Sequence, residues 1–217
     1  MLRYIVKRVL QAIPLLFIIS FLVFSLIQLA PYDVIDSVTT PNMSQQQIDL
    51  LRERYGLNEP FLVQYFVWLK NIFQGDLGYS LVSQKSIAQE LALRIPNTIR
   101  LVLPAYLTAL FLAIVLGLVA AANKGKWADR LIDGIASLGI AIPTFWFAMI
   151  LIYFFGYRLN WFSIIGMHTV GKEGQFGDYL NHFVLPYATL TVAFFPELTR
   201  YIRASATQQV SEDYVMV

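Results

Sequence analysis

Two long apolar runs separated by a short basic linker constrain this chain more than any other feature of its sequence. The runs cover residues 99–122 and 131–158, and the linker, residues 123–130, carries three basic residues against the single acid Asp129. A helix of about 20 apolar residues spans a hydrocarbon core roughly 30 Å thick. Short loops rich in Lys and Arg stay on the cytoplasmic side of a membrane. The two runs therefore predict a transmembrane helical hairpin whose tip lies in the cytoplasm.

The composition agrees with an integral membrane protein. Hydrophobic residues make up 57% of the 217 residues, the mean hydropathy is +0.58, and 14% of residues are charged. An ordinary soluble domain has roughly 25% charged residues. The net charge of +2 gives no argument for nucleic-acid binding. The chain has no cysteine, which excludes disulfides, thiolate metal sites and thiol nucleophiles.

Four apolar runs set the predicted topology. The hairpin contributes spans at 99–122 and 131–157, and two further runs lie at 9–30 and 183–200. The first run follows a basic start and exceeds the apolar core of a signal peptide, about 7 to 15 residues, so we expect it to be retained. Basic flanks place the N-terminus and the tail, residues 204–217, in the cytoplasm. We therefore predict an all-α, polytopic helical bundle with four transmembrane helices.

The long polar segment at residues 31–94 lies outside the cytoplasm on this topology. Ser44 and Gln47 resemble a capping box, which predicts a helix start. A second helix is predicted over residues 60–74, with the proline in its first turn and an aromatic stripe along one side. The segment is therefore predicted to be a small helical extracytoplasmic cap.

A helix break is predicted between this cap and the second span. A short helix over residues 87–94 should end before Pro96, because the residue before a proline is pushed out of the helical conformation. Asn97 or Thr98 would then cap the span at 99–122.

Small residues recur at every fourth position along the second span. They are Ala105, Ala109, Ala113, Gly117 and Ala121. Ladders of this kind let two helix backbones approach closely. The pattern predicts packing against another helix, although alanine is also simply common in membrane helices.

Pro143 lies in the middle of the third span, where a proline removes a backbone hydrogen bond and kinks a helix. Bent helices suit a bundle around a pathway, although inert bundles contain them too. The candidate pathway residues are Pro143, Thr144, Phe145 and Trp146, and packing is the alternative role for them.

Two groups of ionisable residues are candidates for chemical sites. Glu197 lies near the inner end of the fourth run, three residues before Arg200, and an interfacial ion pair is favoured over a proton-coupling carboxylate. Four potential metal ligands of the second outer loop have no metal-motif spacing, so we interpret them as solvated loop residues. They are His168, Glu173, Asp178 and His182.

No catalytic motif is present. The sequence has no nucleophile elbow and no phosphate-binding Gly-rich loop of the Gly-x-x-x-x-Gly-Lys type. The chain itself is therefore predicted not to be an enzyme, and no cofactor or metal is assigned to it. Kinked spans with a structured outer cap favour a transporter subunit.

Several motifs resemble one family over the whole chain. They are Arg54-Tyr-Gly-Leu-Asn-Glu-Pro60, Gly75-Asp-Leu-Gly78, Arg94-Ile-Pro-Asn-Thr98, Ala141-Ile-Pro-Thr-Phe-Trp146 and Ser211-Glu-Asp-Tyr214. Together they resemble the first permease subunit of bacterial dipeptide, oligopeptide and nickel ABC importers.

The resemblance implies a subunit of a binding-protein-dependent type I importer in the bacterial cytoplasmic (inner) membrane. Its implied partners are a second homologous permease, two ATPase subunits that bind ATP and Mg, and an extracytoplasmic substrate-binding protein. Coupling to the ATPase would begin at Ser211, Glu212, Asp213 and Tyr214. Because the family has six spans, the resemblance implies a C-terminally incomplete sequence. Peptide is favoured over nickel as substrate, and the alternative function is a non-transporting membrane scaffold or truncated partner subunit.

Overall fold

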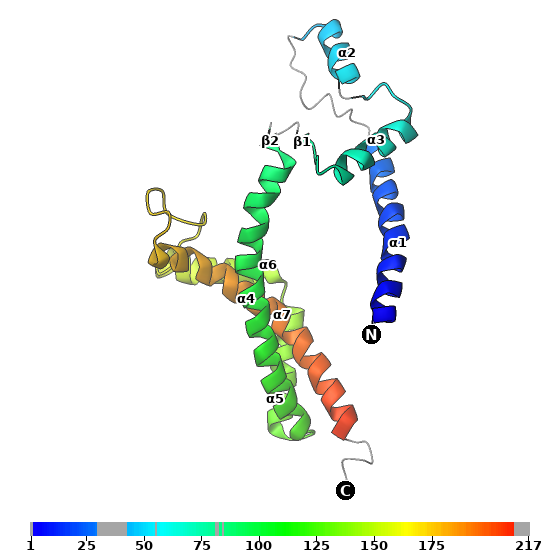
Figure 1. Ribbon diagram of the computed structural model, residues 1–217. Helices are drawn as coiled ribbons and strands as arrows, with labels where there is room; N and C mark the ends of the chain where they lie inside the picture. Colours follow the sequence, from blue (N-terminus) through cyan, green and yellow to red (C-terminus); the bar gives the residue numbers. More distant parts are fainter. Residues whose placement is uncertain (1, 30–42, 55, 81–82, 84, 211–217) are drawn as a thin grey trace. The chain divides into compact units, whose positions relative to one another are not determined.

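The computed structural model describes residues 2–29, 43–54, 56–80, 83 and 85–210 of the chain. Its regular structure is α-helical apart from one pair of two-residue strands and one π-helical segment. The chain forms two compact units, Met1–Arg94 and Ile95–Val217. The predicted helical class is therefore confirmed for the described residues (Figure 1).

The first unit holds three helices and the strand pair. They are α1 (Leu2–Gln28), α2 (Gln45–Arg54), α3 (Phe61–Phe73), β1 (Tyr79–Ser80) and β2 (Lys85–Ser86). The strands pair antiparallel, with Tyr79 opposite Ser86.

Local sequence signals fix the starts of α2 and α3. Ser44 donates its backbone N–H to Gln47 Oε1 at 2.9 Å, and Gln47 donates its own to Ser44 Oγ at 3.4 Å. This reciprocal pair is the predicted capping box. Pro60 directly precedes α3, where its missing N–H costs nothing because first-turn donors have no intrahelical partner. Both predicted helix starts are confirmed.

Aromatic side chains join α1 to α3. The rings of Phe21 and Phe24 lie 5.2 and 5.5 Å from the ring of Tyr65, centroid to centroid. The Tyr65 hydroxyl lies 2.9 Å from Ser20 Oγ, and Tyr65 is 4% exposed. Since a buried tyrosine hydroxyl needs a hydrogen-bond partner, this contact fixes one side of α3 against the first span.

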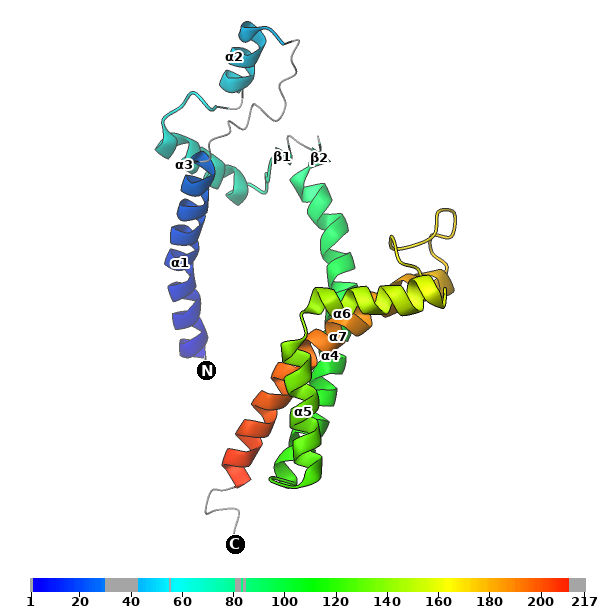
Figure 2. The same ribbon diagram turned by 180° about the vertical axis from the view of Figure 1, so that it is seen from behind.

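The second unit contains most of α4 (Ile87–Ala122) and all later elements. They are α5 (Trp127–Ala141), α6 (Thr144–Leu151), the π-helical segment η2 (Ile152–Arg158) and α7 (Phe176–Val210). In both views α5 lies beside the C-terminal half of α7, and α6 with η2 runs along its first half (Figure 1 and Figure 2). The helix α7 is therefore the element against which this unit packs.

The predicted break at Pro96 is wrong, because α4 runs through both Pro96 and Pro104. Neither Asn97 nor Thr98 caps a helix. A proline inside a helix removes one backbone hydrogen bond. Ending the helix and starting another would instead leave up to four donors and four acceptors without intrahelical partners. Helix formers precede Pro96, so propagation through it is favoured here.

The third span differs from the single kinked helix expected over 131–157. Helix α5 ends at Ala141, α6 begins at Thr144, and their axes differ by 95°. Ile142 and Pro143 are extended, with ψ angles of 119° and 130°. Here the proline acts as predicted on its preceding residue, but it produces a helix start rather than a kink.

Two described helices are long and apolar enough to cross a membrane, α1 over Arg3–Gln28 and α4. The bent pair of α5 with α6 and η2 makes a third if it crosses as one span. The predicted span at 183–200 lies inside the continuous α7, which does not belong to that group. The count of four spans is therefore not confirmed by the described residues.

Candidate functional site

The small-residue ladder of α4 is buried, and one of its members closely approaches α7. Ala105, Ala109, Ala113, Gly117 and Ala121 are all buried. A Cβ added to Gly117 would lie 2.9 Å from Ile202 Cγ2, so no larger side chain fits there without movement. Closer to the N-terminus of α4, Thr108 Oγ1 accepts a 2.7 Å hydrogen bond from the Tyr187 hydroxyl. The two helices therefore touch at two separate points.

The four pathway candidates lie at the sharp turn between α5 and α6. Pro143 caps α6, and Thr144 lines a pocket of about 170 Å³ together with Gly139 and Val192. Phe145 and Trp146 point away from the unit and are 68% and 48% exposed. Thr144 is exposed as well, so these three residues form an exposed first turn of α6. Their role in a pathway stays a prediction.

The predicted coupling residues Ser211, Glu212, Asp213 and Tyr214 lie outside the described residues. The structure does describe the helix that leads to them, because α7 continues to Val210.

A partly buried ion pair connects this part of α7 to the start of α5 next to the hairpin linker. Arg203 Nε donates to Asp129 Oδ1 at 2.5 Å, and Arg203 Nη2 donates to Asp129 Oδ2 at 2.9 Å. The Gly125 backbone N–H also donates to Asp129 Oδ2, at 2.8 Å. The Asp129 side chain is 5% exposed. Bidentate arginine–carboxylate pairs combine strength with fixed geometry, so the linker and α7 are held in one orientation.

A second, looser pair lies beside it. Arg200 Nε is 3.6 Å from Asp133 Oδ1, and Arg200 Nη2 donates to Ser137 Oγ at 3.4 Å. The expected ion pair of Arg200 with Glu197 is absent from the described contacts, because the arginine turns toward α5 and Glu197 is exposed. The predicted pair of Arg200 with Glu197 is therefore replaced by a pair of Arg200 with Asp133 of α5.

The loop that connects η2 to α7 is held to the start of α7 through Asp178. Thr169 donates to it from its hydroxyl at 2.7 Å and from its backbone N–H at 2.8 Å. These hydrogen bonds stabilise the charged carboxylate and keep the pKa of Asp178 below its ordinary value. Hydrogen bonds from the Glu173 and Gly171 backbone likewise lower the pKa of Glu173. In the described part of the chain, no three His, Cys, Asp or Glu residues form a metal-binding group. The interpretation as solvated loop residues is wrong for Asp178 and His182, because both lie in the first turns of α7 with side chains 9% and 5% exposed.

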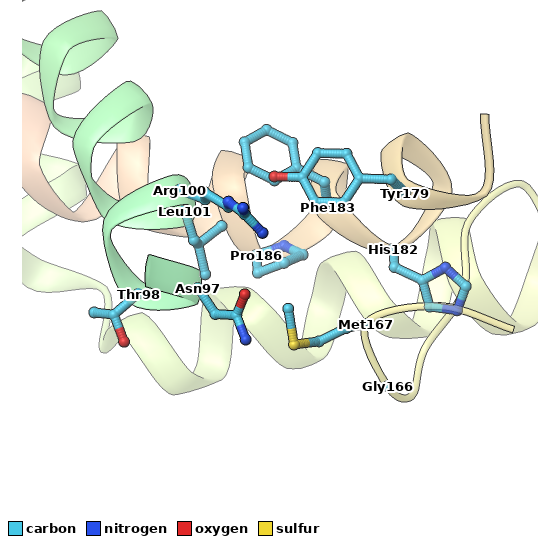
Figure 3. Close-up of a pocket in the computed structure, with 10 residues that line it drawn as sticks. All are labelled: Asn97, Thr98, Arg100, Leu101, Gly166, Met167, Tyr179, His182, Phe183 and Pro186. Carbon is cyan, nitrogen blue, oxygen red and sulfur yellow. The ribbon is translucent and has the colours of Figure 1, made fainter. Parts of the chain in front are cut away.

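A pocket of about 320 Å³ opens between the N-terminal parts of α4 and α7 and is closed on one side by the loop at Gly166 and Met167 (Figure 3). Asn97 and Arg100 line it from α4, and Tyr179 lines it from α7. A second pocket of about 370 Å³ adjoins it and has walls of mostly apolar side chains from α6, the loop and α7.

The sequence analysis did not predict the ion pairs between α5 and α7 or the role of Arg100 in the pocket. Asp129 and Asp133 are spaced i, i+4 near the start of α5, and Arg200 and Arg203 are spaced i, i+3 on α7. Two charged stripes of opposite sign on apolar helices were the available signal. Arg100, a lone cation within an otherwise apolar run, was a signal of the same kind.

Comparison with protein families identifies the chain. Residues 113–217 match the model of the binding-protein-dependent transport system inner membrane component, and residues 1–102 match the model of the N-terminal part of such membrane components. The oligopeptide transport system permease protein AppB of Bacillus subtilis (strain 168) is 37% identical over 216 residues, which are 99% of this chain and 68% of that protein. The chain belongs to this family of inner membrane transport components.

A second group of relatives is named for another substrate, glutathione. The glutathione transport system permease protein GsiC of Escherichia coli (strain K12) is 35% identical over 215 residues, which are 99% of this chain and 67% of that protein. The GsiC of Escherichia coli O6:H1 is 36% identical over the same share. The family resemblance inferred from the motifs is confirmed, and this inner membrane component is a permease of the binding-protein-dependent ABC importers.

Proposed function

We propose that this chain is the membrane-spanning permease subunit of an ATP-driven, binding-protein-dependent importer of peptides. The observation that carries the proposal is the 37% identity to an oligopeptide permease over 99% of the chain. The relatives named for glutathione, a tripeptide, favour the same chemical class of substrate. The permease would form the translocation pathway together with a second, homologous permease.

The proposed orientation puts the N-terminus, the linker 123–130 and the end of α7 in the cytoplasm. Basic residues before α1 and in the linker support it, because such residues remain on the cytoplasmic side. On this orientation the Asp129–Arg203 pair lies next to the segment that we expect to contact an ATPase subunit. A push on that segment would then reach α5 as well as α7.

ATP hydrolysis is assigned to two separate ATPase subunits, which would bind ATP and Mg. Closure of the ATPase dimer would shift the permease helices between outward- and inward-facing arrangements. The 95° turn at Pro143 supports this reading, since two short helices joined by an extended dipeptide change their relative angle more readily than one straight helix. The binding protein would deliver its peptide at the outer face, near the cap.

Uptake by the reconstituted assembly tests the proposal. Proteoliposomes that contain this permease, the second permease and the ATPase subunits should import a labelled peptide from its loaded binding protein, and import should require ATP. Omission of this chain should abolish import. Unchanged import without it would support a scaffold role instead, and competition by nickel but not by unlabelled peptide would reassign the substrate.

The same assay separates an ion-coupled carrier from an ATP-driven importer. A carrier that uses Glu197 would retain uptake without ATP and lose it in Glu197→Gln. Glu197 is exposed and forms no ion pair with Arg200 among the described contacts, so we expect Glu197→Gln to leave ATP-driven uptake unchanged.

A further inference from the structure

The pocket between the outer parts of α4 and α7 contains an arginine without an acidic partner. Arg100 makes no ion pair and no hydrogen bond through its side chain with any residue that the structure describes, although it belongs to an apolar membrane-spanning candidate. Ionisable residues in such helices are costly and usually serve a pathway or a partner. The nearby acids are already engaged, Asp178 with Thr169 and Glu173 with the Gly171 backbone.

The side chains that line the pocket suit an anion that accepts several hydrogen bonds. Figure 3 shows the Arg100 guanidinium and the Tyr179 hydroxyl turned toward the same side of the pocket, with the Asn97 amide across from Met167. Guanidinium groups bind carboxylates through two parallel hydrogen bonds. Amide and hydroxyl donors nearby can satisfy the remaining carboxylate lone pairs.

The adjoining pocket suits an apolar group next to that anion. The two pockets share His182 and Pro186, and the second one is walled by Ile152, Ile164 and Leu185. The His182 Nδ1 lies 2.8 Å from the Asp178 carbonyl oxygen, so this ring is fixed in the wall between them. A carboxylate beside an apolar side chain is the chemistry of the C-terminal residue of a peptide.

We propose that this pocket is a substrate subsite in which Arg100 binds a free carboxylate of the transported peptide, with an apolar side chain of the peptide in the adjoining pocket. The inference rests on the proposed function and adds to it a position on the permease and a chemical requirement of the substrate. A lipid phosphate is the competing anion, because long basic side chains also reach headgroups. The closed loop wall and the second, apolar pocket favour the peptide.

A fluorescent label in the pocket wall tests the proposal without the binding protein. Because the chain contains no cysteine, Met167→Cys creates a single attachment site in this subunit. The labelled, assembled transporter in nanodiscs is titrated with a peptide whose side chains are all neutral and with the same peptide amidated at its C-terminus. We expect the free acid to bind roughly tenfold or more tightly than the amide, since hydrogen bonds to charged groups of this kind contribute about one or two powers of ten.

Substitutions at two arginines distinguish charge recognition from a general effect. Arg100→Gln should remove the preference for the free acid, and Arg100→Lys should keep part of it. Arg158→Gln is the matched control, because Arg158 is an exposed outer arginine that lies over the Tyr153 ring rather than in the pocket. A peptide with one acidic side chain and an amidated C-terminus shows whether the bound carboxylate must be terminal.

Each outcome bears on one hypothesis. Equal affinities of acid and amide in the unmodified Arg100 background overturn the carboxylate subsite. A signal that follows the anionic lipid content of the nanodisc and ignores both peptides overturns it in favour of a lipid contact. The proposed function fails separately, if the proteoliposomes import no peptide. Normal ATP-dependent import together with equal affinities would therefore reject this subsite alone.

Discussion

The arginines at the two ends of the second unit have opposite environments, one paired with a carboxylate and one not. At the linker end, Arg203 is held by both oxygens of a buried aspartate that also accepts a backbone hydrogen bond. At the other end, Arg100 lines an open pocket without an acidic partner among the described residues. A fully paired charge in a packed site fixes a geometry, whereas an unpaired one beside a cavity is available to a ligand. The Asp129–Arg203 pair therefore fixes the helices at the linker end, whereas Arg100 at the pocket end has space beside it for a ligand.

Packing follows the same division. Near the linker, a Cβ on Gly117 would lie 2.9 Å from Ile202 Cγ2, so α4 and α7 touch closely there. At the opposite end of the unit, pockets of about 320 and 370 Å³ lie among α4, α6 and α7. Interiors normally leave few voids larger than a water molecule. The open end is therefore where the unit can accept or release a molecule.

The largest expected effect comes from breaking the paired end. Arg203→Ala leaves the Asp129 carboxylate buried without its bidentate partner, and removing one member of a buried pair is strongly destabilising. We expect peptide uptake by the assembled transporter to fall at least about tenfold, with a lower melting temperature in nanodiscs.

Arg200→Ala is the matched control for this substitution. Arg200 is half exposed and its carboxylate contact at 3.6 Å is long, and such surface pairs contribute little. An equal loss of melting temperature in both variants would remove the distinction between the buried pair and its exposed neighbour.

The second effect concerns close packing on α5. Gly139→Ala forces a methyl group against Pro196, and we expect destabilisation by about 1–3 kcal/mol, typical of an overpacked core. Gly134→Ala, on the same helix, meets nothing within 4 Å. It should stabilise the helix by about 0.5–1 kcal/mol through lower backbone entropy in the unfolded chain. Thermal unfolding of both variants measures the contrast, and shifts of the same sign would contradict it.

The third effect is the loss of one hydrogen bond between α4 and α7. Tyr187→Phe removes the donor to Thr108 Oγ1, and we expect a loss of roughly 1 kcal/mol. Tyr201→Phe is the control, because Tyr201 is 73% exposed on the same helix. If both variants melt at the same temperature as the parent, then the apolar ladder alone holds the two helices together.

Local features of the fold were predictable from the sequence. The capping box at Ser44, the start of α3 after Pro60 and the linker between α4 and α5 all depend on residues within one or two turns of each other. Periodicity and turn chemistry report such features directly. The family also followed from motifs, each of which is short and local.

Long-range features were not predictable in the same way. Pro96 continues a helix and Pro143 separates two, although both follow an isoleucine. What differs is the surroundings, since α5 ends where Gly139 meets Pro196 of a distant segment. The partner of Arg200 likewise lies on α5 and not on its own helix. A single sequence shows which residues are charged and how they are spaced along a helix, but it does not show which other helix carries their partners.

The smallest effect tests how firmly the outer loop is held beside the open pocket. Thr169 donates two hydrogen bonds to Asp178 and lowers the pKa of that carboxyl in the folded state. A carboxyl whose folded pKa is depressed adds stability above its ordinary pKa, and this stability is lost as the pH falls through the folded value.

Thr169→Val keeps the backbone donor and removes the hydroxyl, so the folded pKa of Asp178 should move up toward its ordinary value. The melting temperature of the variant should then be lower than that of the parent at neutral pH, and the two should converge as the pH falls, so that the acid limb of the variant is shallower. Ser163→Ala, in the same loop, keeps its backbone contact to Asn181 and should leave the acid limb unchanged. Coincident acid limbs in Thr169→Val and the parent would show that the Asp178 carboxylate does not couple the loop to α7.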